Sequence, residues 1–563
     1  MMNLETFFNH FELLADAPNG VQKLRELILQ LAVMGKLVPQ DKNDEPASIL
    51  LEKIKAEKAK LFKDKKIKKS KPLTPITDDE IPYNLPIGWE WVRLDDITLL
   101  ITDGAHHTPT YTFSGVPFLS VKDISSGFIN LANTRFISEE THQKLIKRCH
   151  PEFNDILLTK VGTTGIAKVI DIDIEFSIFV SLALLKFNKS LIYTYYLELL
   201  INSPLVKEKS AKNTQGVGNK NLVLKHIKNF VTPLPPLNEQ HRIVKKVAQL
   251  MKYCDELENK KTEQKKQLIL LGETATNKLI KTKEEDFKNN WQQIQENFEL
   301  IYSTPENIKQ LRQTILQLAV MGKLVPQDKS DETASILLEK IKSEKAKLVK
   351  DKKIKKSKPL PPITDDEIPY NLPVGWEWVR LGNIVNFIGG SQPPKNKFIY
   401  HEEKGYTRLI QIRDFKSEEF KTFVPNQYAN RPFSKDDVMI GRSGPPVFQI
   451  LRGLEGTYNV ALMKADPIHL LISKDYLYYL LQEPRIQKIV IAESERTAGQ
   501  TGVRKELINA FVIGLPSLNE QHRIVKKVDQ LMKYCDDLEQ QLTQGIEYRK
   551  KLIQTAIYQL LAA

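Results

Sequence analysis

The sequence predicts an α+β protein built as an internal repeat, in which near-identical helical frames carry two unlike globular inserts. The segment from Leu24 to Leu94 returns from Leu311 to Leu381 with eight substitutions in 71 positions. The inserts that follow, 95–233 and 382–514, share almost no sequence. Near-identical frames offer the same surface to a partner, whereas divergent inserts cannot recognise the same target. We therefore expect one scaffold, two equivalent partners and two unequal targets.

Each frame begins with a short apolar helix. The sequences LRELILQLAVM and LRQTILQLAVM end at Gly35 and Gly322, ahead of a Val-Pro break that cannot continue a helix. The similarity reaches further back, because NLETFFNHFELL near the N-terminus aligns with NWQQIQENFELI from Asn290.

A lysine-rich run follows in each frame and accounts for the net positive charge. Residues 52–71 and 339–358 each hold ten Lys against three acids, so the two runs contribute +14 to a chain whose net charge is +13. Each run starts like a helix and ends at a proline. One interpretation is a solvated face or mobile linker, and the other is a clamp on the DNA backbone.

The two inserts share a faint strand skeleton. Each begins with tryptophans at alternate positions, in GWEWVRL, which predicts a strand that packs on the core. FLSVKDI from Phe118 parallels LIQIRDF from Leu409, and NDILLTKVG parallels DDVMIGRSG. In the latter pair a strand ends at Lys160 or Arg442 with Gly two residues later, which predicts a tight turn that presents the cation. The loops QGVGNK and QTGVRK near the insert ends hold side chains that hydrogen-bond to base edges, although ordinary surface loops have the same composition.

A long helix leaves each insert, from about 238 to 281 in the first repeat and from 519 to the end in the second. Asn238 and Asn519 are the predicted N-caps, and the following glutamates suit a first turn. Apolar residues at alternating spacings of four and three predict a coiled-coil seam. The seam residues are Ile243, Val247, Leu250, Cys254, Leu257, Ile524, Val528, Leu531, Cys535 and Leu538, and the second seam extends through Leu542, Leu552 and Ala556.

The last helix needs an apolar partner, and the expected partner is the N-terminal helix near 21–34. The middle helix runs directly into the second frame, but no frame follows the last helix. Packing the two ends of the chain together would close the molecule into a pseudo-two-fold ring.

Composition and motifs argue against export and against catalysis. The start of the chain lacks a basic signal region, and the longest uncharged apolar run, around 176–185, is too short for a membrane span, so a cytoplasmic protein is predicted. Cys254 and Cys535 fall at apolar helical spacing and read as buried hydrophobes rather than disulfide or zinc ligands. There is no phosphate-binding loop, and no methyltransferase motif. The adjacent pair His106 and His107 has no third metal ligand in view, which favours a surface or DNA contact.

The frame motifs resemble those of one protein family. GWEWVRL, LPPLNEQHRIVKKV, LRQTILQLAVMGKLVPQD and the closing KLIQTAIYQLLAA are similar to the specificity subunit of Type I restriction-modification systems over the whole chain. TDGAHHTPTYTFSGVPFLSVKDIS in the first insert resembles a target-recognition domain of that family.

The resemblance implies two α/β target-recognition domains held apart by long helices in an antiparallel coiled coil. Each domain would read one half of a bipartite asymmetric DNA target, with half-sites about 10 base pairs apart. Two modification subunits with S-adenosylmethionine would dock on the duplicated helices, and restriction subunits would add ATP- and Mg-dependent cleavage, so this chain needs no cofactor. The expected segments are 1–80 (N-terminal helical region and Lys-rich linker), 81–236 (first recognition domain), 237–367 (central helices and second linker), 368–517 (second recognition domain) and 518–563 (C-terminal helix).

Polar residues in the insert loops are the candidate DNA contacts. For the first half-site they are His106, His107, Thr108, Tyr111, Lys122, Lys160, Thr163, Gln215, Asn219 and Lys220. For the second they are Ser391, Gln392, Lys395, Gln411, Arg413, Arg442, Ser443, Gln500, Thr501 and Arg504.

Two other functions remain open on the sequence, a self-contained methyltransferase or nuclease and a protein scaffold without a DNA role. The first would need a cofactor motif, and the second leaves two unlike inserts without a purpose. The length of the near-identical repeated sequence also suggests that inserts can be exchanged by recombination.

Overall fold

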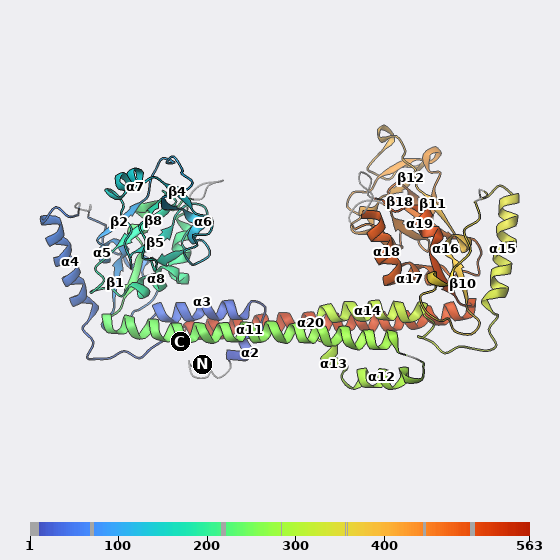
Figure 1. The fold of residues 1–563 in the computed structure, drawn as a ribbon, viewed down its shortest axis with the longest axis horizontal. Helices are drawn as coiled ribbons and strands as arrows, with labels where there is room; N and C mark the ends of the chain where they lie inside the picture. The colour runs from blue at the N-terminus through green and yellow to red at the C-terminus, as the bar shows by residue number, and fades with distance from the viewer. Residues whose placement is uncertain are drawn as a thin grey trace. The chain divides into compact units, whose positions relative to one another are not determined.

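The computed structural model describes residues 11–67, 72–214, 221–282, 284–354, 356, 358–442, 446–495 and 502–562 (Figure 1). The chain divides into two compact units. Unit 1 comprises residues 1–262 together with 546–563, and unit 2 comprises residues 263–545. Each unit therefore holds one frame and one insert.

Unit 1 contains the first insert, between helices of the frame. Its described elements are α2 (Phe11–Ala15), α3 (Gly20–Val33), α4 (Ala47–Lys63), η1 (Asp78–Glu80), β1 (Glu90–Arg93), α5 (Leu94–Ile97), β2 (Leu100–Asp103), β3 (Val116–Leu119), α6 (Val121–Ile124), β4 (Arg135–Ile137), α7 (Glu139–Ile146), β5 (Ile156–Thr159), β6 (Ala167–Val169), β7 (Ser177–Ile178), β8 (Leu182–Lys186), α8 (Thr194–Asn202), α9 (Pro204–Lys212), α10 (Leu224–Lys228), β9 (Val231–Leu234) and the first part of α11 (Leu237–Lys281).

Unit 2 repeats the same order with local differences. Its described elements are α12 (Glu284–Glu296), α13 (Phe298–Ile301), α14 (Pro305–Val320), α15 (Ala334–Lys350), η2 (Asp365–Glu367), β10 (Glu377–Arg380), α16 (Leu381–Ile384), β11 (Val385–Gly389), η3 (Lys395–Lys397), β12 (Tyr406–Ile410), η4 (Ile412–Phe415), β13 (Phe423–Pro425), η5 (Asn426–Tyr428), β14 (Pro432–Phe433), β15 (Val438–Gly441), β16 (Ile450–Leu451), β17 (Gly456–Tyr458), β18 (Leu462–Pro467), α17 (Lys474–Leu481), α18 (Pro484–Glu495), α19 (Lys505–Ala510), β19 (Val512–Leu515) and most of α20 (Leu518–Ala562).

Two small sheets form the body of each insert. In unit 1 the strand orders are β2-β8-β5-β6, which is antiparallel, and β4-β3-β7, in which β3 and β7 are parallel. In unit 2 the corresponding orders are β11-β18-β15-β16 and β13-β12-β17-β14. The central strands β5 and β15 are buried along their whole length, as continuous apolar runs predict. The predicted strands at NDILLTKVG and DDVMIGRSG are thus confirmed, whereas the VKDI half of FLSVKDI is the short helix α6.

A two-stranded ribbon closes the base of each insert. β1 pairs with β9 in antiparallel register, from Glu90 opposite Leu234 to Arg93 opposite Val231, and β10 pairs with β19 in the same way. The chain therefore enters and leaves each insert through adjacent strands, so both ends of the insert lie at the same place on the frame.

A buried glutamate on each long helix fixes that ribbon to the frame. In unit 1 the carboxylate of Glu239 accepts hydrogen bonds from Trp89 Nε1 (2.9 Å) and Gln40 Nε2 (3.1 Å). Burial raises the pKa of Glu239, and these donors oppose the rise. Glu520 accepts the same pair of bonds in unit 2, from Trp376 and Gln327. The sequence prediction for these glutamates, a favourable charge in the first turn, missed this role.

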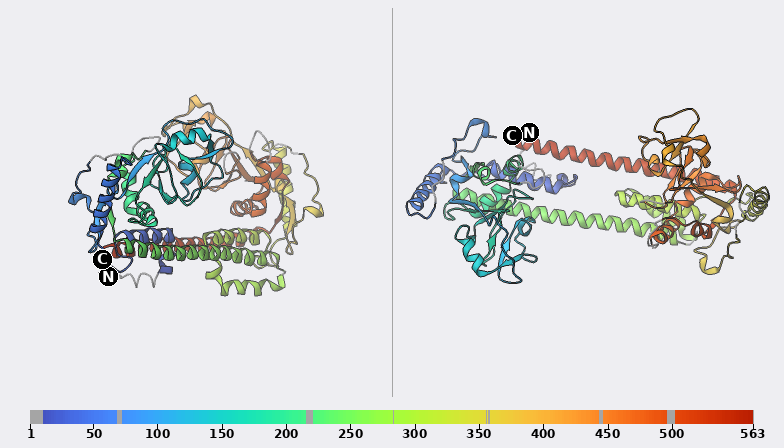
Figure 2. Two further views of the ribbon diagram at one scale, coloured as in Figure 1. Left: turned by 60° about the vertical axis from the view of Figure 1, so that its left-hand side comes forward. Right: turned by 90° about the horizontal axis from the view of Figure 1, so that it is seen from above.

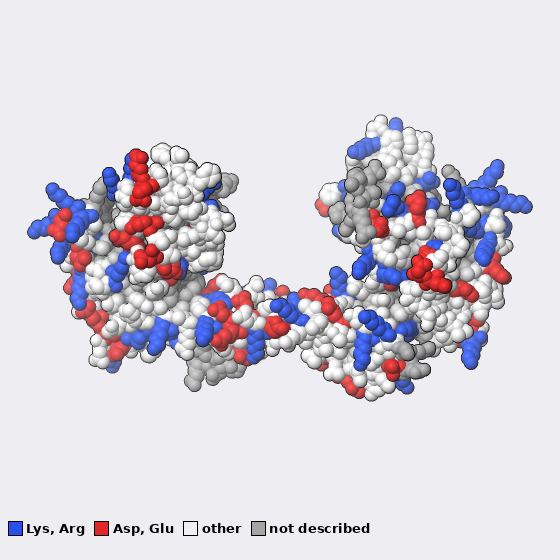
Figure 3. Space-filling model, in the orientation of Figure 1, with Lys and Arg blue, Asp and Glu red and all other residues white. Residues whose placement is uncertain are grey.

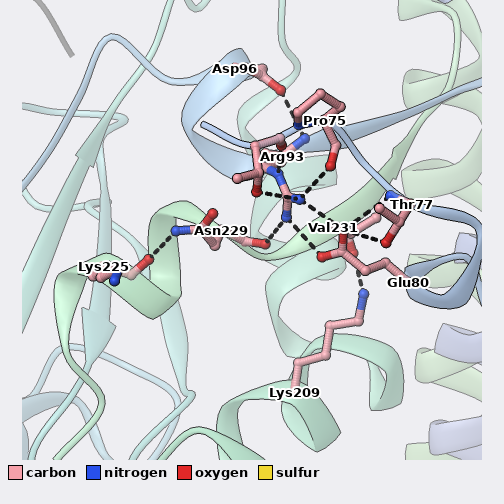
Figure 4. A network of polar contacts seen from close by, with 10 residues as sticks. Pro75, Thr77, Glu80, Arg93, Asp96, Lys209, Lys225, Asn229 and Val231 are labelled. Atoms are coloured by element: carbon pink, nitrogen blue, oxygen red, sulfur yellow. Dashed lines mark hydrogen bonds and ion pairs between the residues drawn. The ribbon is translucent and has the colours of Figure 1, made fainter. Parts of the chain in front are cut away.

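A second buried network holds the strand that opens each insert (Figure 4). The Arg93 guanidinium forms a two-pronged ion pair with Glu80, at 2.8 and 3.0 Å, and donates to the backbone oxygens of Thr74, Pro75 and Asn229. Arg380 makes the equivalent contacts in unit 2. A fork of five donors suits such a site better than the single ammonium of lysine does.

The first predicted seam is buried, and the second is buried at three positions but half-buried at Leu531 and Leu538. Ile243, Val247, Leu250, Cys254 and Leu257 share one core with α3, and the equivalent residues of α20 pack in the core that includes α14. Cys254 and Cys535 are buried free thiols, as predicted, and burial raises both pKa values to about 11. Figure 2 shows α11 and α20 as unbroken helices, and each has 45 residues.

The two ends of the chain pack together in unit 1, as predicted. Ile553, Ala556 and Leu560 belong to the core that contains α3. Lys36 Nζ also donates a hydrogen bond of 3.1 Å to the backbone oxygen of Leu561.

Two sequence predictions about the helices need correction. The helices start one residue before Asn238 and Asn519, so these are not the N-caps; in α20 the cap is Ser517, whose Oγ accepts from the Glu520 amide at 3.1 Å. Leu552 is exposed and its neighbour Ile553 is buried instead, because the heptad phase shifts near the end of α20. The helix-like start predicted for each Lys-rich run is confirmed, because helices cover Ala47–Lys63 and Ala334–Lys350.

Helices α4 and α15 pack on their inserts through one apolar side. Ala47, Leu50 and Ile54 are buried, and Lys58 Nζ donates to the Asp95 backbone oxygen at 2.6 Å. Figure 3 shows Lys and Arg side chains gathered over the outer ends of both helices. The solvated-face interpretation is therefore confirmed for the described lysines of α4, which lie on a packed helix and not on a mobile linker, while the DNA-clamp interpretation stays a prediction.

Candidate functional site

One buried carboxylate organises the candidate site of unit 1. Asp103 is the last residue of β2, opposite Ala183 of the central strand β8. Its side chain is 4% exposed and lies 3.0 Å from Lys160 Nζ, 3.0 Å from His106 Nε2 and 2.6 Å from Arg148 Nη2. Burial alone would raise the pKa of Asp103, but the hydrogen bonds from Lys160 and His106 outweigh burial and lower it. Asp103 is therefore an ionised hub for three basic groups.

The loop after β2 carries the exposed candidates of this unit. A Cβ at Gly104 would lie 1.9 Å from the Ile178 backbone oxygen, so only glycine allows the loop to pass this close to β7. His106, His107 and Thr108 follow on the exposed side of the loop. A glycine is therefore needed at the point where the loop leaves the sheet.

The ring of Tyr111 packs between an aromatic and a basic side chain in the same region. Tyr111 is half-buried against Phe118, and the Arg135 guanidinium lies 4.4 Å from the centre of its ring. Tyr111 is thus a packing residue with one open edge rather than a free contact.

The remaining described candidates of unit 1 differ in how exposed their side chains are to a DNA partner. Lys160 is buried on Asp103, so it is a structural cation instead of the exposed one predicted. Lys122 is exposed on α6, and its ammonium donates to the Asn133 backbone oxygen at 2.8 Å. Thr163 is exposed just after Gly162, whose φ of +78° confirms the predicted turn.

Unit 2 places its candidates at the matching positions. Gln392, Lys395 and Gln411 line a hollow of about 470 Å³ with Asn459. The side chain of Ser391 donates to Asn430 Oδ1 at 2.8 Å. Ser391, Gln392 and Lys395 come from the loop after β11, which matches the histidine loop of unit 1, whereas Gln411 follows β12 and Asn459 follows β17.

Three arginines of unit 2 are exposed. Arg413 lies over the ring of Phe420, at 6.0 Å from its centre, and Arg504 Nη2 lies 3.7 Å from Glu493. Arg442 follows β15, and no carboxylate among the described residues pairs with it. These cations are available to an anionic or base-edge partner.

Six predicted contacts lie outside the described residues. They are Gln215, Asn219, Lys220, Ser443, Gln500 and Thr501.

The structure brings His106 and Lys160 together and adds two residues that the sequence did not reveal. Asp103 and Arg148 complete the cluster. Asp103 lies 57 residues from Lys160 in the sequence, and Arg148 lies 45 residues from Asp103. No spacing rule joins such residues, because the strand pairing of β2, β8 and β5 creates their proximity. Across the described parts of the chain, no group of three His, Cys, Asp or Glu is arranged to hold a metal ion.

The arrangement offers hydrogen-bond donors and positive charge on loops above rigid sheets. Such loops suit recognition of base edges and phosphates.

Comparison with known proteins decides the family. The sequence model of the Type I restriction modification DNA specificity domain matches residues 86–267 and 373–548. The chain is 34% identical to the EcoEI specificity subunit of Escherichia coli, over 93% of this chain and 91% of that protein. It is 35% identical to the EcoAI specificity subunit of Escherichia coli, over 92% and 90% of the two chains.

The chain belongs to the specificity subunits of Type I restriction enzymes. The predicted family, the mixed helix-and-sheet class with two recognition domains, and the role as a non-catalytic DNA-recognition subunit are thereby confirmed. A self-contained methyltransferase or nuclease is not favoured. A solved chain from work on the assembly and conformational transition of the type I R-M system aligns with this specificity subunit at a TM-score of 0.49 and 19% identity, covering 84% of this chain and 98% of that one.

As a specificity subunit, the chain acts with DNA and with other subunits of a restriction-modification complex. No described helix is both long and apolar enough to cross a membrane.

Proposed function

We propose that this specificity subunit reads a bipartite, asymmetric DNA target, with one half-site for each recognition domain. The observation that carries the proposal is the contrast between the two units. Their frames repeat the same ribbon, the same Trp–Glu bond and the same Arg–Glu pair, whereas their loops present different side chains. Equal supports with unequal readers favour a target whose two halves differ.

Two equivalent docking places for modification subunits form the second part of the proposal. Exposed apolar residues recur at matching frame positions: Ile87 and Val374 are 99% and 95% exposed, and Leu13 and Leu300 are 53% and 54% exposed. Apolar side chains that recur in the same exposed place favour the same partner twice. Two modification subunits per chain would bring S-adenosylmethionine, and restriction subunits would bring ATP and Mg. The complex would work in the cytoplasm, where it meets DNA.

Mapping methylated adenines in cells that carry this chain and its modification partner tests the target. The expected result is one sequence with two unlike specified halves and an unspecified gap. A continuous target, or a symmetrical one, would contradict two different readers. Methylation by the purified chain alone would instead favour an enzyme.

Native mass spectrometry of the assembled complex tests the docking places. Ile87→Asp and Val374→Asp are each expected to remove one modification subunit, and the double variant both. Phe113→Asp, at a fully exposed position within the first insert, is the control for a charge added elsewhere. Equal stoichiometry in the double variant and the parent would refute docking at these positions.

A further inference from the structure

The last residue of the first sheet strand differs in charge between the two recognition domains. Asp103 of β2 lies opposite Ala183, which also pairs with Leu158 of β5. In unit 2, Gly389 of β11 lies opposite Met463, which also pairs with Ile440 of β15. The register therefore makes Asp103 and Gly389 equivalent.

The two units also hold an equivalent cation at the end of the third strand in the order, two residues after Leu158 of β5 or Ile440 of β15. The Lys160 amide donates to the Ser181 backbone oxygen at 2.9 Å, and its own oxygen accepts from Leu222. The Arg442 amide donates to the Ala461 oxygen at 2.8 Å, and its own oxygen accepts from Val503. Lys160 and Arg442 thus leave the same point of the same sheet.

The presence or absence of the Asp103 carboxylate determines whether the cation at Lys160 or Arg442 is buried or exposed. Lys160 Nζ is 3.0 Å from Asp103, and its side chain is only 6% exposed. Arg442 has a glycine in place of the aspartate and remains exposed. A Cβ built on Gly389 would lie 4.0 Å from Arg442 Nη1, so the guanidinium stands where the aspartate would reach.

Asp103 also orients two exposed basic groups. Arg148 Nη2 lies 2.6 Å from Asp103 and 3.1 Å from His106 Nε2. The side chains of Arg148 and His106 are 55% and 52% exposed, in contrast to Lys160. The Asp103 carboxylate therefore holds Lys160 in the interior, while its other two partners, Arg148 and His106, remain exposed.

We propose that position 103 or 389 selects which cation reads the DNA. Asp103 is a positioning residue that retains Lys160 in the fold and aims Arg148 at the first half-site. Gly389 leaves Arg442 to read the second half-site. The chemistry of both readers is that of a guanidinium on a guanine edge, because arginine donates to guanine O6 and N7 together. This inference rests on the proposed function and names the residues that carry it.

Gly389→Asp is the direct test, since it gives unit 2 the carboxylate of unit 1. Gly389 has no neighbouring atom closer than 4.0 Å to an added Cβ and needs no left-handed backbone, so the aspartate fits. The full chain, assembled with its modification subunits, is incubated with randomised DNA duplexes, and retained duplexes are sequenced. Enrichment of one guanine in the second half-site is expected to fall about tenfold or more.

The experiment carries its own controls. The first half-site is read by the untouched domain and should be unchanged in the same pool. Gly389→Asn adds the same bulk without the charge and is expected to lose far less enrichment. Arg442→Gln should reproduce the Gly389→Asp loss with the strand unaltered, and it replaces that variant if the aspartate prevents assembly.

Arg148→Ala is the matching test in unit 1, where one guanine of the first half-site should lose about tenfold in enrichment. The inference is overturned if Gly389→Asp or Arg148→Ala leaves its half-site unchanged. It is also overturned if either variant weakens retention of all duplexes equally, which marks a phosphate contact. The proposed function fails separately, if the parent complex enriches no bipartite sequence.

Discussion

Arg93 and Arg380 show how one side chain secures the base of a recognition domain. Each guanidinium is nearly fully buried, pairs with one glutamate and donates to three backbone oxygens of distant segments. Removing the arginine leaves those oxygens without a partner inside the protein, where the loss of a partner is most costly.

Arg93→Met is expected to lower the free energy of unfolding by about 3–5 kcal/mol. The measurement is urea unfolding, followed by a signal from the buried tryptophans. Lys53→Ala, which breaks a half-exposed pair with Glu45, should cost about 0–1 kcal/mol and serves as the control. Equal costs for the two variants would contradict the importance of burial.

The partner glutamates of these arginines predict acid sensitivity. The Arg380 guanidinium lowers the pKa of Glu367 to about 2, and Arg93 lowers the pKa of Glu80 in the same direction. A carboxyl with a lowered pKa stabilises the fold above its unfolded pKa of about 4.3, and that stability is lost as the pH falls towards the folded value.

The double variant Glu80→Gln/Glu367→Gln should therefore lose less stability than the parent between about pH 6 and about pH 3. Urea midpoints at both pH values give the comparison. Asp64→Asn removes a carboxylate that forms no ion pair with a described residue, and it should retain the pH dependence of the parent. A double variant with that same dependence would disprove the assignment.

Residue roles at the candidate site were only partly predictable from the sequence. Polar loops, the turn after Lys160 and the place of Arg442 at a strand end follow from composition and glycine spacing. The different fates of these two cations do not, because the deciding residue is Asp103 or Gly389 on a separate strand. A charge that lies close only through strand pairing leaves no periodic signal in the chain.

At the scale of elements, the end of α20 offers two neighbouring residues with opposite environments. Ile553 is 0% exposed in the core with α3, and Leu552 is 37% exposed. Ile553→Ala is expected to lower the free energy of unfolding by about 2–5 kcal/mol, and Leu552→Ala by under about 1 kcal/mol.

Urea unfolding of both variants gives the comparison, and hydrogen exchange at α3 shows where stability is lost. Faster exchange in α3 should accompany Ile553→Ala alone. A similar loss in both variants would mean that the C-terminal segment does not pack against α3 as described.

Helix positions were more predictable than helix ends. The alternation of four and three correctly gave the seam from Ile243 to Leu257, because a sustained apolar stripe has one consistent solution. The same rule failed at Leu552, because an α-helix of about 3.6 residues per turn drifts against the 3.5-residue heptad period, and the buried face has moved to Ile553 there. Asn238 has the chemistry of a cap, but the Gln240 amide already donates to the Pro236 oxygen, so the helix begins earlier, at Leu237.

At the scale of the whole molecule, equal ribbons make the inserts interchangeable parts. Replacing 382–514 by a second copy of 95–233 should give a chain that directs methylation to an inverted repeat of the first half-site. Methylome mapping reads the result directly. The support is that Arg93 and Arg380, and likewise Trp89 and Trp376, make matching frame contacts.

The reciprocal chain, with 382–514 in both frames, is the control and should direct methylation to an inverted repeat of the second half-site. A chimera that assembles with its partners but retains the asymmetric target would show that specificity depends on the frames. The same interchangeability supports the hypothesis that related genes exchange these inserts.

The closing ribbon and the shared core of unit 1 also impose an order on synthesis. β1 must wait for β9, about 140 residues later, which is roughly 7–28 s at ribosomal speed. Each recognition domain can thus fold before its frame closes beneath it. Helix α3 precedes Ile553 by about 520 residues, so its core gains Ile553 and Leu560 long after α3 itself is made. A chain that stops before α20 therefore lacks one side of this core, and the apolar residues of α3 that face Ile553 and Leu560 stay uncovered in it.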